Sequence, residues 1–114
     1  MAIFVLIHGS WHGAWCYEKV IPLFEANNHR VFAPDLPGHG KDKTPLKAVT
    51  FDSYVNCIKA ILEKITERVI LVGHSMAGMV ISQVAEYLPA KIHKLVYLAG
   101  FLPQSGQSDR KSVV

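Results

Sequence analysis

The fold is decided by one stretch of the sequence, which reads Val69-Ile70-Leu71-Val72-Gly73-His74-Ser75-Met76-Ala77-Gly78-Met79. Four apolar residues, three of them β-branched, run into a short turn and then into a helical pattern. We therefore expect a strand, a sharp turn and a helix, with Ser75 at the apex of the turn. Such a turn tolerates only small residues two positions before and after the serine, where Gly73 and Ala77 stand. This spacing favours a nucleophile elbow over an ordinary tight turn that holds a serine, although glycine is commoner than alanine at the second position.

The rest of the chain repeats this alternation of strand and helix. Apolar runs predict three further strands, at residues 3–7, 31–33 and 95–99. Amphipathic patterns predict three helices, over residues 15–26, 51–65 and 76–88. The strands are continuously apolar, which is typical of a parallel sheet buried on both faces. The predicted fold class is α/β, a mainly parallel sheet of about four strands flanked by three helices, with Pro22 kinking or shortening the first helix.

Composition limits the chain to one domain over residues 1–114 and excludes several classes of protein. Half of the residues are hydrophobic and only 18% are charged, which excludes a disordered, acidic or collagen-like chain. The mean hydropathy is +0.21. This value indicates more apolar surface than a chain of this length buries by itself. The net charge is +3, and the basic residues are scattered apart from Lys41, Lys43 and Lys47. We interpret these three as solvated loop residues and expect no nucleic-acid partner.

Cysteine usage and hydropathy favour a cytoplasmic location. The two cysteines, Cys16 and Cys57, lie inside apolar helical patterns and fit neither a disulfide framework nor a metal site. We expect both to be reduced core residues. The apolar opening at residues 2–7 lacks a basic flank and is too short for a signal peptide. No apolar run approaches the ~20 residues of a membrane span, so we expect a soluble cytoplasmic protein without a membrane partner.

A second motif, His8-Gly9-Ser10-Trp11-His12-Gly13-Ala14-Trp15, follows the first predicted strand. A carbonyl attacked by Ser75 becomes an oxyanion, which two backbone N–H donors must stabilise. We expect one donor to be the N–H of Met76 and the other the N–H of Ser10. Gly9 and Gly13 would let this loop bend toward the substrate. The alternative is an ordinary glycine-rich turn.

Four stretches together resemble the α/β-hydrolase superfamily, and within it the methylesterase and hydroxynitrile-lyase-like branch. They are residues 4–15, Asp35-Leu36-Pro37-Gly38-His39-Gly40, residues 69–79, and Leu95-Val96-Tyr97-Leu98-Ala99-Gly100-Phe101-Leu102-Pro103. Their order and spacing fit over roughly residues 1–107, which correspond to the N-terminal half of the family's fold.

The resemblance implies a serine hydrolase that acts on small carboxylic esters through an acyl-enzyme. It implies Ser75 as the nucleophile, and no metal or organic cofactor. Lyases of this branch carry threonine at the position of Gly9 whereas the esterases carry glycine, so the resemblance favours ester hydrolysis. It also suggests a substrate pocket lined by Gly9, Trp11, Phe101 and Leu102. Simple core packing is an equally good interpretation of the last two.

The catalytic acid and histidine expected after Ser75 are missing. The only later histidine is His93, and the only later acids are Glu86 and Asp109. His93 opens a strand parallel to the one before Ser75, which places it roughly 20 Å away at the wrong edge of the sheet. His29 also precedes a strand, and the His74 side chain should point away from its neighbour Ser75. Strand order leaves three histidines at the correct edge as substitute bases: His8, His12 and His39.

The C-terminal end also departs from the resemblance. The family continues with an apolar cap and further strands, whereas residues 108–114 are polar and are expected to form a disordered tail. We interpret the chain as a truncated member of the family, lacking the cap and the C-terminal strands. Its fourth strand would then be an exposed apolar edge, through which a homodimer could form. The alternative function is a non-catalytic, ligand-binding or dimerising remnant of the fold.

Overall fold

The structure, a computed structural model, describes residues 1–9 and 12–98. Within them four strands form one sheet in the order β2-β1-β3-β4, and every neighbouring pair is parallel. The strands are β1 (Ile3–Ile7), β2 (Arg30–Phe32), β3 (Val69–His74) and β4 (Ile92–Leu98). The predicted α/β class with a parallel sheet is confirmed. The strand predicted at 95–99 begins earlier than expected, and Ala99 lies outside the described residues.

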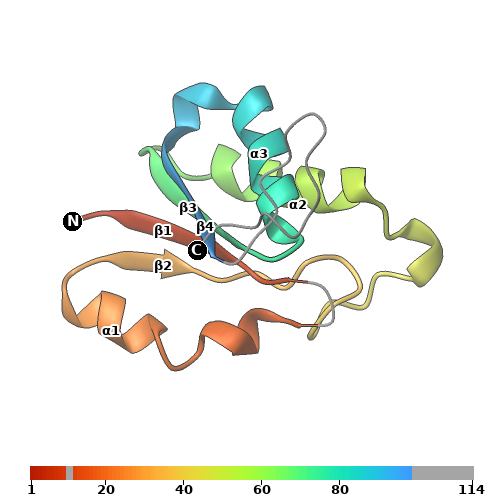
Figure 1. The fold of residues 1–114 in the computed structure, drawn as a ribbon, viewed down its shortest axis with the longest axis horizontal. Coiled ribbons are helices and arrows are strands. Elements are labelled where there is room, and N and C mark those ends of the chain that lie inside the picture. Colours follow the sequence, from red (N-terminus) through yellow and green to blue (C-terminus); the bar gives the residue numbers. More distant parts are fainter. Residues whose placement is uncertain (10–11, 99–114) are drawn as a thin grey trace.

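Helices lie on both sides of this sheet. They are α1 (Ile21–Ala26), α2 (Phe51–Glu63) and α3 (Ala77–Tyr87), with 3-10 turns η1 (Ala14–Tyr17), η2 (Leu46–Ala48) and η3 (Pro89–Lys91). Figure 1 shows α2 and α3 together on one side of the sheet and α1 on the other. The predicted stop of the third helix near Pro89 is confirmed, since α3 ends at Tyr87.

The first helix is shortened at Pro22, as predicted, but the single helix expected over residues 15–26 does not form. The chain instead makes the turn η1 and then the six-residue helix α1, with Pro22 in its first turn. Proline has no N–H to donate inside a helix and is tolerated only where a helix begins, so it restarts the helix here. Trp15 and Leu23, expected on the buried face, are 59% and 65% exposed.

The main core lies between the sheet and the pair α2 and α3. Its apolar residues come from β1, β3 and the stripes predicted on the two helices, and they include Val5, Ile58, Leu71 and Ile81, each fully buried. Helix α2 begins at a capping box, in which Thr50 accepts from the backbone N–H of Ser53 and Ser53 Oγ accepts from the N–H of Thr50. Asp52 lies in its first turn, where its negative charge faces the positive end of the helix dipole.

The opposite face of the sheet is only partly covered. Leu6, Tyr17 and Val72 form a small buried cluster there. The Tyr17 hydroxyl donates to the carbonyl of Ile7 over 2.8 Å, and burial raises its pKa to about 12. A groove of about 750 Å³ lies beside this cluster, between the sheet and the segment from η1 to α1; it is lined by apolar residues of both, among them Phe4, Val20, Leu23, Phe24, Val96 and Leu98.

The two cysteines differ from the prediction and from each other. Cys16 is exposed and lines this groove, whereas Cys57 packs half-buried against the main core. Burial raises the pKa of the Cys57 thiol. The expectation of a core position therefore fails for Cys16, because the turn η1 does not present it to the sheet as a continuous helix would.

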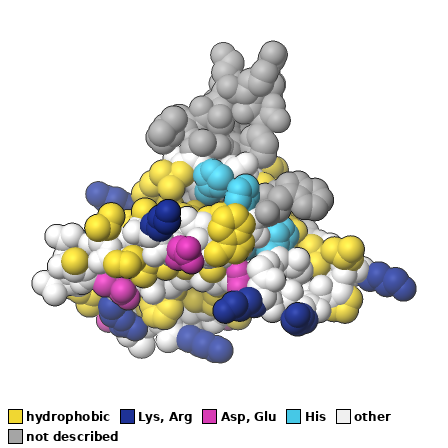
Figure 2. All heavy atoms as spheres, turned by 90° about the horizontal axis from the view of Figure 1, so that it is seen from below, with side chains coloured by type: hydrophobic (Ala, Val, Ile, Leu, Met, Phe, Trp, Pro, Cys, Tyr) yellow, Lys and Arg dark blue, Asp and Glu magenta, His cyan; other side chains and the backbone are white. Residues whose placement is uncertain are grey.

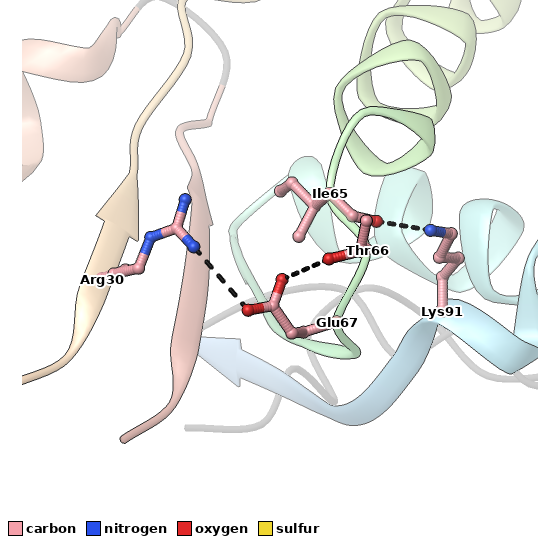
Figure 3. Close-up of polar contacts among 5 residues, drawn as sticks. All are labelled: Arg30, Ile65, Thr66, Glu67 and Lys91. Atoms are coloured by element: carbon pink, nitrogen blue, oxygen red, sulfur yellow. Dashed lines mark hydrogen bonds and ion pairs between the residues drawn. The ribbon is translucent and has the colours of Figure 1, made fainter.

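The edge of the sheet where the strands begin is held by polar contacts (Figure 3). Arg30 at the start of β2 pairs with Glu67 over 3.8 Å, and Thr66 donates to the same carboxylate over 2.8 Å. The Lys91 ammonium donates to the carbonyl of Ile65. These contacts tie the loop before β3 to its neighbours.

Two further predictions concern the three loop lysines and membrane spans. Lys41, Lys43 and Lys47 are all exposed, as expected of solvated loop residues. Within residues 1–9 and 12–98 the longest helix has 13 residues, and none combines the length and hydropathy that a membrane span requires.

Candidate active site

The parallel register brings two segments together at the edge where the strands end. Ile7 at the end of β1 pairs with Gly73 of β3, and His74 pairs with Leu98 at the end of β4. The loop after β1 and the turn after β3 therefore meet. This is the edge where α/β proteins place their ligands.

Ser75 occupies a strained turn between β3 and α3. Its φ angle is +56°, in the left-handed region that non-glycine residues seldom enter. Hydrogen bonds hold this conformation: the Ser75 N–H donates to the carbonyl of Leu98 over 3.2 Å, and its carbonyl accepts from the N–H of Gly78 over 2.9 Å. Strain of this kind clusters at functional sites, where the surroundings enforce it.

The small residues around Ser75 are required by close packing. A Cβ added at Gly73 would lie 2.7 Å from the carbonyl oxygen of Ala77 and 3.0 Å from the side chain of Ile81. Ala77 itself is fully buried. The helix thus lies directly against the strand that precedes it, which is the physical basis of the spacing found in the sequence.

Gly9 brings the loop after β1 against the serine. A Cβ at Gly9 would lie 3.1 Å from Cβ of Ser75, 3.0 Å from the carbonyl oxygen of His74 and 3.2 Å from Nδ1 of His74. Two motifs far apart in the sequence therefore touch at Gly9 and Ser75. The carbonyl of Gly9 also accepts from the N–H of His12 over 3.3 Å.

Helix α3 starts one residue later than the sequence suggests. Ser75 and Met76 form a turn, and the helix runs from Ala77 with Met76 as its N-cap residue. The positive end of the helix dipole still lies next to Ser75, since the N-cap is its immediate neighbour. This arrangement favours negative charge at the serine.

His8 is removed from acid–base chemistry by its hydrogen bonds. The ring is fully buried, and its Nε2 accepts from the N–H of Leu36 over 2.9 Å. The proton therefore sits on Nδ1, which donates to the carbonyl of Gly9 over 2.8 Å. Burial lowers the pKa of this imidazole. Strand order alone leaves His8 as a base, but both of its ring nitrogens hold backbone groups.

The other histidines at this edge form a cluster of rings. His39 packs on His8 with 5.1 Å between ring centroids and on Tyr54 with 5.7 Å, and its Nδ1 lies 3.1 Å from the carbonyl of Pro37. His12 meets His74 edge to face at 5.8 Å. Figure 2 shows histidine side chains grouped on one face of the molecule, among hydrophobic ones.

A cavity of about 360 Å³ lies beside the histidine cluster. It is lined by His12, Gly38, His39, Gly40, Leu46, Val49 and Tyr54. Sequence reasoning missed Leu46, Val49 and Tyr54, because no motif marks a loop residue or a helix residue that faces a cavity. Three residues predicted to form the substrate pocket, Trp11, Phe101 and Leu102, lie outside the described residues. So does Ser10, the second predicted oxyanion donor.

Asp35 anchors the loop that carries His39. Its carboxylate accepts from the N–H of Ala14 over 2.7 Å and from the N–H of Lys41 over 3.1 Å. Burial opposes ionisation of Asp35, but these hydrogen bonds outweigh it and lower the pKa. Asp35 thus joins the loops after β1 and β2.

Other titratable residues lie away from the serine. His93 is exposed near the start of β4, at the opposite end from Leu98. The ring of His29 accepts from the N–H of Ala2, also where the strands begin. Glu86 is exposed on α3. No group of three or more His, Cys, Asp or Glu in the described part of the chain could hold a metal ion.

Comparison with known proteins identifies the family. The sequence pattern of the alpha/beta hydrolase family matches residues 4–113. The chain belongs to the α/β-hydrolase family. It is 44% identical over 107 residues to an alpha-hydroxynitrile lyase and 42% identical over 109 residues to methylesterase 1, both from Arabidopsis thaliana. These alignments cover 90% and 92% of the chain but 41% of each relative.

A solved structure agrees with this assignment. The crystal structure of polyneuridine aldehyde esterase superposes with a TM-score of 0.87 at 34% identity, over 95% of this chain and 44% of that one. The resemblance to the methylesterase and hydroxynitrile-lyase-like branch is therefore confirmed. This α/β hydrolase spans less than half the length of these relatives, and it matches an esterase and a lyase almost equally well.

Proposed function

We propose that this α/β hydrolase carries the nucleophile half of a serine esterase acting on small carboxylic esters. The observation that supports it most is the geometry of Ser75. The residue holds a left-handed conformation between β3 and α3, with Gly9 packed against it and a helix N-terminus beside it. Each of these features suits a serine hydroxyl that attacks a carbonyl.

The proposed reaction has two steps. Ser75 Oγ attacks the ester carbonyl carbon, and the backbone N–H groups of Met76 and Ser10 donate to the oxyanion. The carbon–oxygen bond to the alcohol then breaks, the alcohol leaves with the serine proton, and an acyl-enzyme remains. Water attacks this acyl group, which releases the carboxylic acid and restores the hydroxyl. Neither a metal nor an organic cofactor is needed for these steps.

Two histidines are the candidates for the general base of this reaction. His8 cannot take the serine proton while Leu36 N–H occupies Nε2. His12 and His39 remain, and both line the cavity at this edge. We assign neither a catalytic acid nor a catalytic histidine within these 114 residues. The chain spans less than half the length of its relatives. That a whole protein containing this chain acts on small carboxylic esters is therefore also part of our proposal.

Gly9 supports hydrolysis over the lyase reaction of the Arabidopsis relative. A threonine here, as the lyases carry, would place its Cβ 3.1 Å from Cβ of Ser75 and add a hydroxyl and a methyl next to the nucleophile. Glycine fits this close contact without displacing the loop from the nucleophile.

Hydrolysis of p-nitrophenyl acetate by the purified chain and by its Ser75→Ala variant tests the proposal. We expect the unsubstituted chain to acquire one acetyl group on the peptide that contains Ser75, detected by mass spectrometry, and Ser75→Ala to acquire none. If turnover occurs, Ser75→Ala should reduce it to background, and His12→Ala and His39→Ala then identify the base. Equal background rates and no acetylation in folded samples would contradict the proposal and favour a ligand-binding or dimerising remnant.

A further inference from the structure

We propose that Ser82 and Tyr97 are positioning residues, whose mutual hydrogen bond fixes α3 against β4 and thereby holds Ser75 in its reactive conformation. This inference rests on the proposed role of Ser75. The Ser82 Oγ and the Tyr97 hydroxyl lie 2.6 Å apart, and both side chains are half-buried. Within the described part of the chain, no other hydrogen bond between two side chains joins a helix to a strand.

The direction of this hydrogen bond follows from the second contact of Ser82. Its hydroxyl also lies 3.0 Å from the carbonyl of Gly78, one helical turn earlier. A carbonyl can only accept, so the single proton of Ser82 goes to Gly78. Tyr97 must then donate to Ser82. Both hydroxyl protons are thus used, and the two contacts form a chain from β4 into the first turn of α3.

These two hydrogen bonds connect to both backbone hydrogen bonds of Ser75. Gly78, which accepts from Ser82, donates its own N–H to the carbonyl of Ser75 over 2.9 Å. The N–H of Ser75 donates to the carbonyl of Leu98, the residue after Tyr97. Both backbone contacts of the strained serine therefore lead to residues that the Ser82–Tyr97 bond holds in place.

The strand and the helix beside the elbow each lack one support that this hydrogen bond supplies. Within residues 1–9 and 12–98, β4 pairs only with β3, so it is an edge strand, and edge strands open more readily than central ones. Helix α3 has no side-chain cap at Met76. A left-handed Ser75 persists only when its surroundings enforce it. The Ser82–Tyr97 bond links this strand to the helix next to Ser75.

Amide hydrogen exchange, followed residue by residue by NMR, tests the proposal in the full chain whether or not it turns over ester. We expect Ser82→Ala and Tyr97→Phe each to speed exchange at the amides of Ser75 and Gly78 by roughly three- to tenfold, the effect of losing one hydrogen bond. Exchange at the core amides of Val5 and Leu71 should stay unchanged. The double variant should not exceed Ser82→Ala, because the bond that Tyr97→Phe removes is already lost in Ser82→Ala.

Two control variants separate positioning from general loss of stability. Tyr87→Phe removes a hydroxyl from an exposed tyrosine of the same helix and should change nothing. Ser82→Thr keeps the hydroxyl and should restore slow exchange. If the chain hydrolyses p-nitrophenyl acetate, Ser82→Ala and Tyr97→Phe should lower kcat with little change in KM. Unchanged exchange at Ser75, or equal acceleration at Val5 and Leu71, overturns the proposal, whereas failed acetylation at Ser75 bears only on the esterase function.

Discussion

At the scale of single residues, His8 illustrates how neighbours decide what a side chain can do. Its ring joins the end of β1 to Leu36 and to its own neighbour Gly9 through both nitrogens. A protonated ring would have to donate at Nε2, where the N–H of Leu36 already points. The neutral form is thus built into the structure, and it matches the lowered pKa of the buried ring.

His8 should make stability depend on pH. The folded state keeps the ring neutral, whereas the unfolded chain protonates it below about pH 6.5. The unfolded state then binds the additional proton, so the free energy of unfolding should fall as pH falls from about 6.5 toward the lower pKa of the folded state. Urea denaturation at a series of pH values measures this. His8→Asn should show a shallower dependence, and equal slopes for the two proteins would contradict the assignment.

The packing of Gly73 leads to a prediction about side-chain size. Gly73→Ala should destabilise the chain by about 2–3 kcal/mol, because the new methyl meets backbone that cannot move independently. Gly9→Ala should cost less, since its nearest neighbours lie at 3.0–3.2 Å rather than 2.7 Å. Urea denaturation of both variants gives the order. A smaller effect at Gly73 than at Gly9 would contradict this account of the elbow.

The sequence predicts some residues of the site better than others. Gly73, Ser75 and Ala77 are readable because their roles depend on neighbours within two positions along the chain. The roles of His8, His12 and His39 are not, since strand order places all three at one edge without distinguishing them. That distinction depends on contacts such as the one between residues 8 and 36, which no local pattern encodes.

At the scale of elements, α2 and α1 mark the two extremes of predictability. The apolar stripe of α2 repeats at helical spacing and begins at a cap, so local preference and burial agree, and the helix forms as predicted. In the segment before β2, Pro22 interrupts the helical pattern, so one continuous helix cannot form. The result is a turn and a short helix that leave Trp15 exposed. Apolar spacing alone does not show whether the apolar face of a helix will pack against the sheet.

The cap of α2 should contribute measurably to stability. Thr50→Ala removes the side-chain acceptor for the N–H of Ser53 and should lower the free energy of unfolding by about 1 kcal/mol. Thr50→Ser retains the hydroxyl and should stay close to the unsubstituted chain. Thermal or urea denaturation distinguishes the two variants. An alanine variant as stable as the serine variant would show that the capping box does not support the helix.

At the scale of the whole molecule, the two faces of the sheet differ. The face under α2 and α3 is covered by a continuous core, whereas the face under α1 carries an open apolar groove. The alternation of elements predicts the parallel sheet and the helices α2 and α3 correctly. It does not predict how completely each face is covered, because coverage depends on where every helix docks.

Self-association should follow from the groove and from the edge of β4. We expect sedimentation velocity to show a species that grows with protein concentration, as the proposed homodimer requires. Leu23→Glu, on the rim of the groove, should weaken this association if the groove takes part. Leu46→Glu is the matched control, because Leu46 is 84% exposed and lies outside the groove. A monomer at every concentration would remove the dimer.

The parallel register has a consequence for how the sheet assembles. No two neighbouring strands can be joined by a tight hairpin, so each pairing must close a long stretch of chain. The central pairing joins residues as distant as Phe4 and Ile70, whereas β3 meets β4 after a much shorter excursion. Loop-closure entropy therefore favours β3 with β4 first and β1 with β3 last. The contact between Gly9 and Ser75, which joins the two halves of the candidate site, would accordingly be among the latest to form during folding.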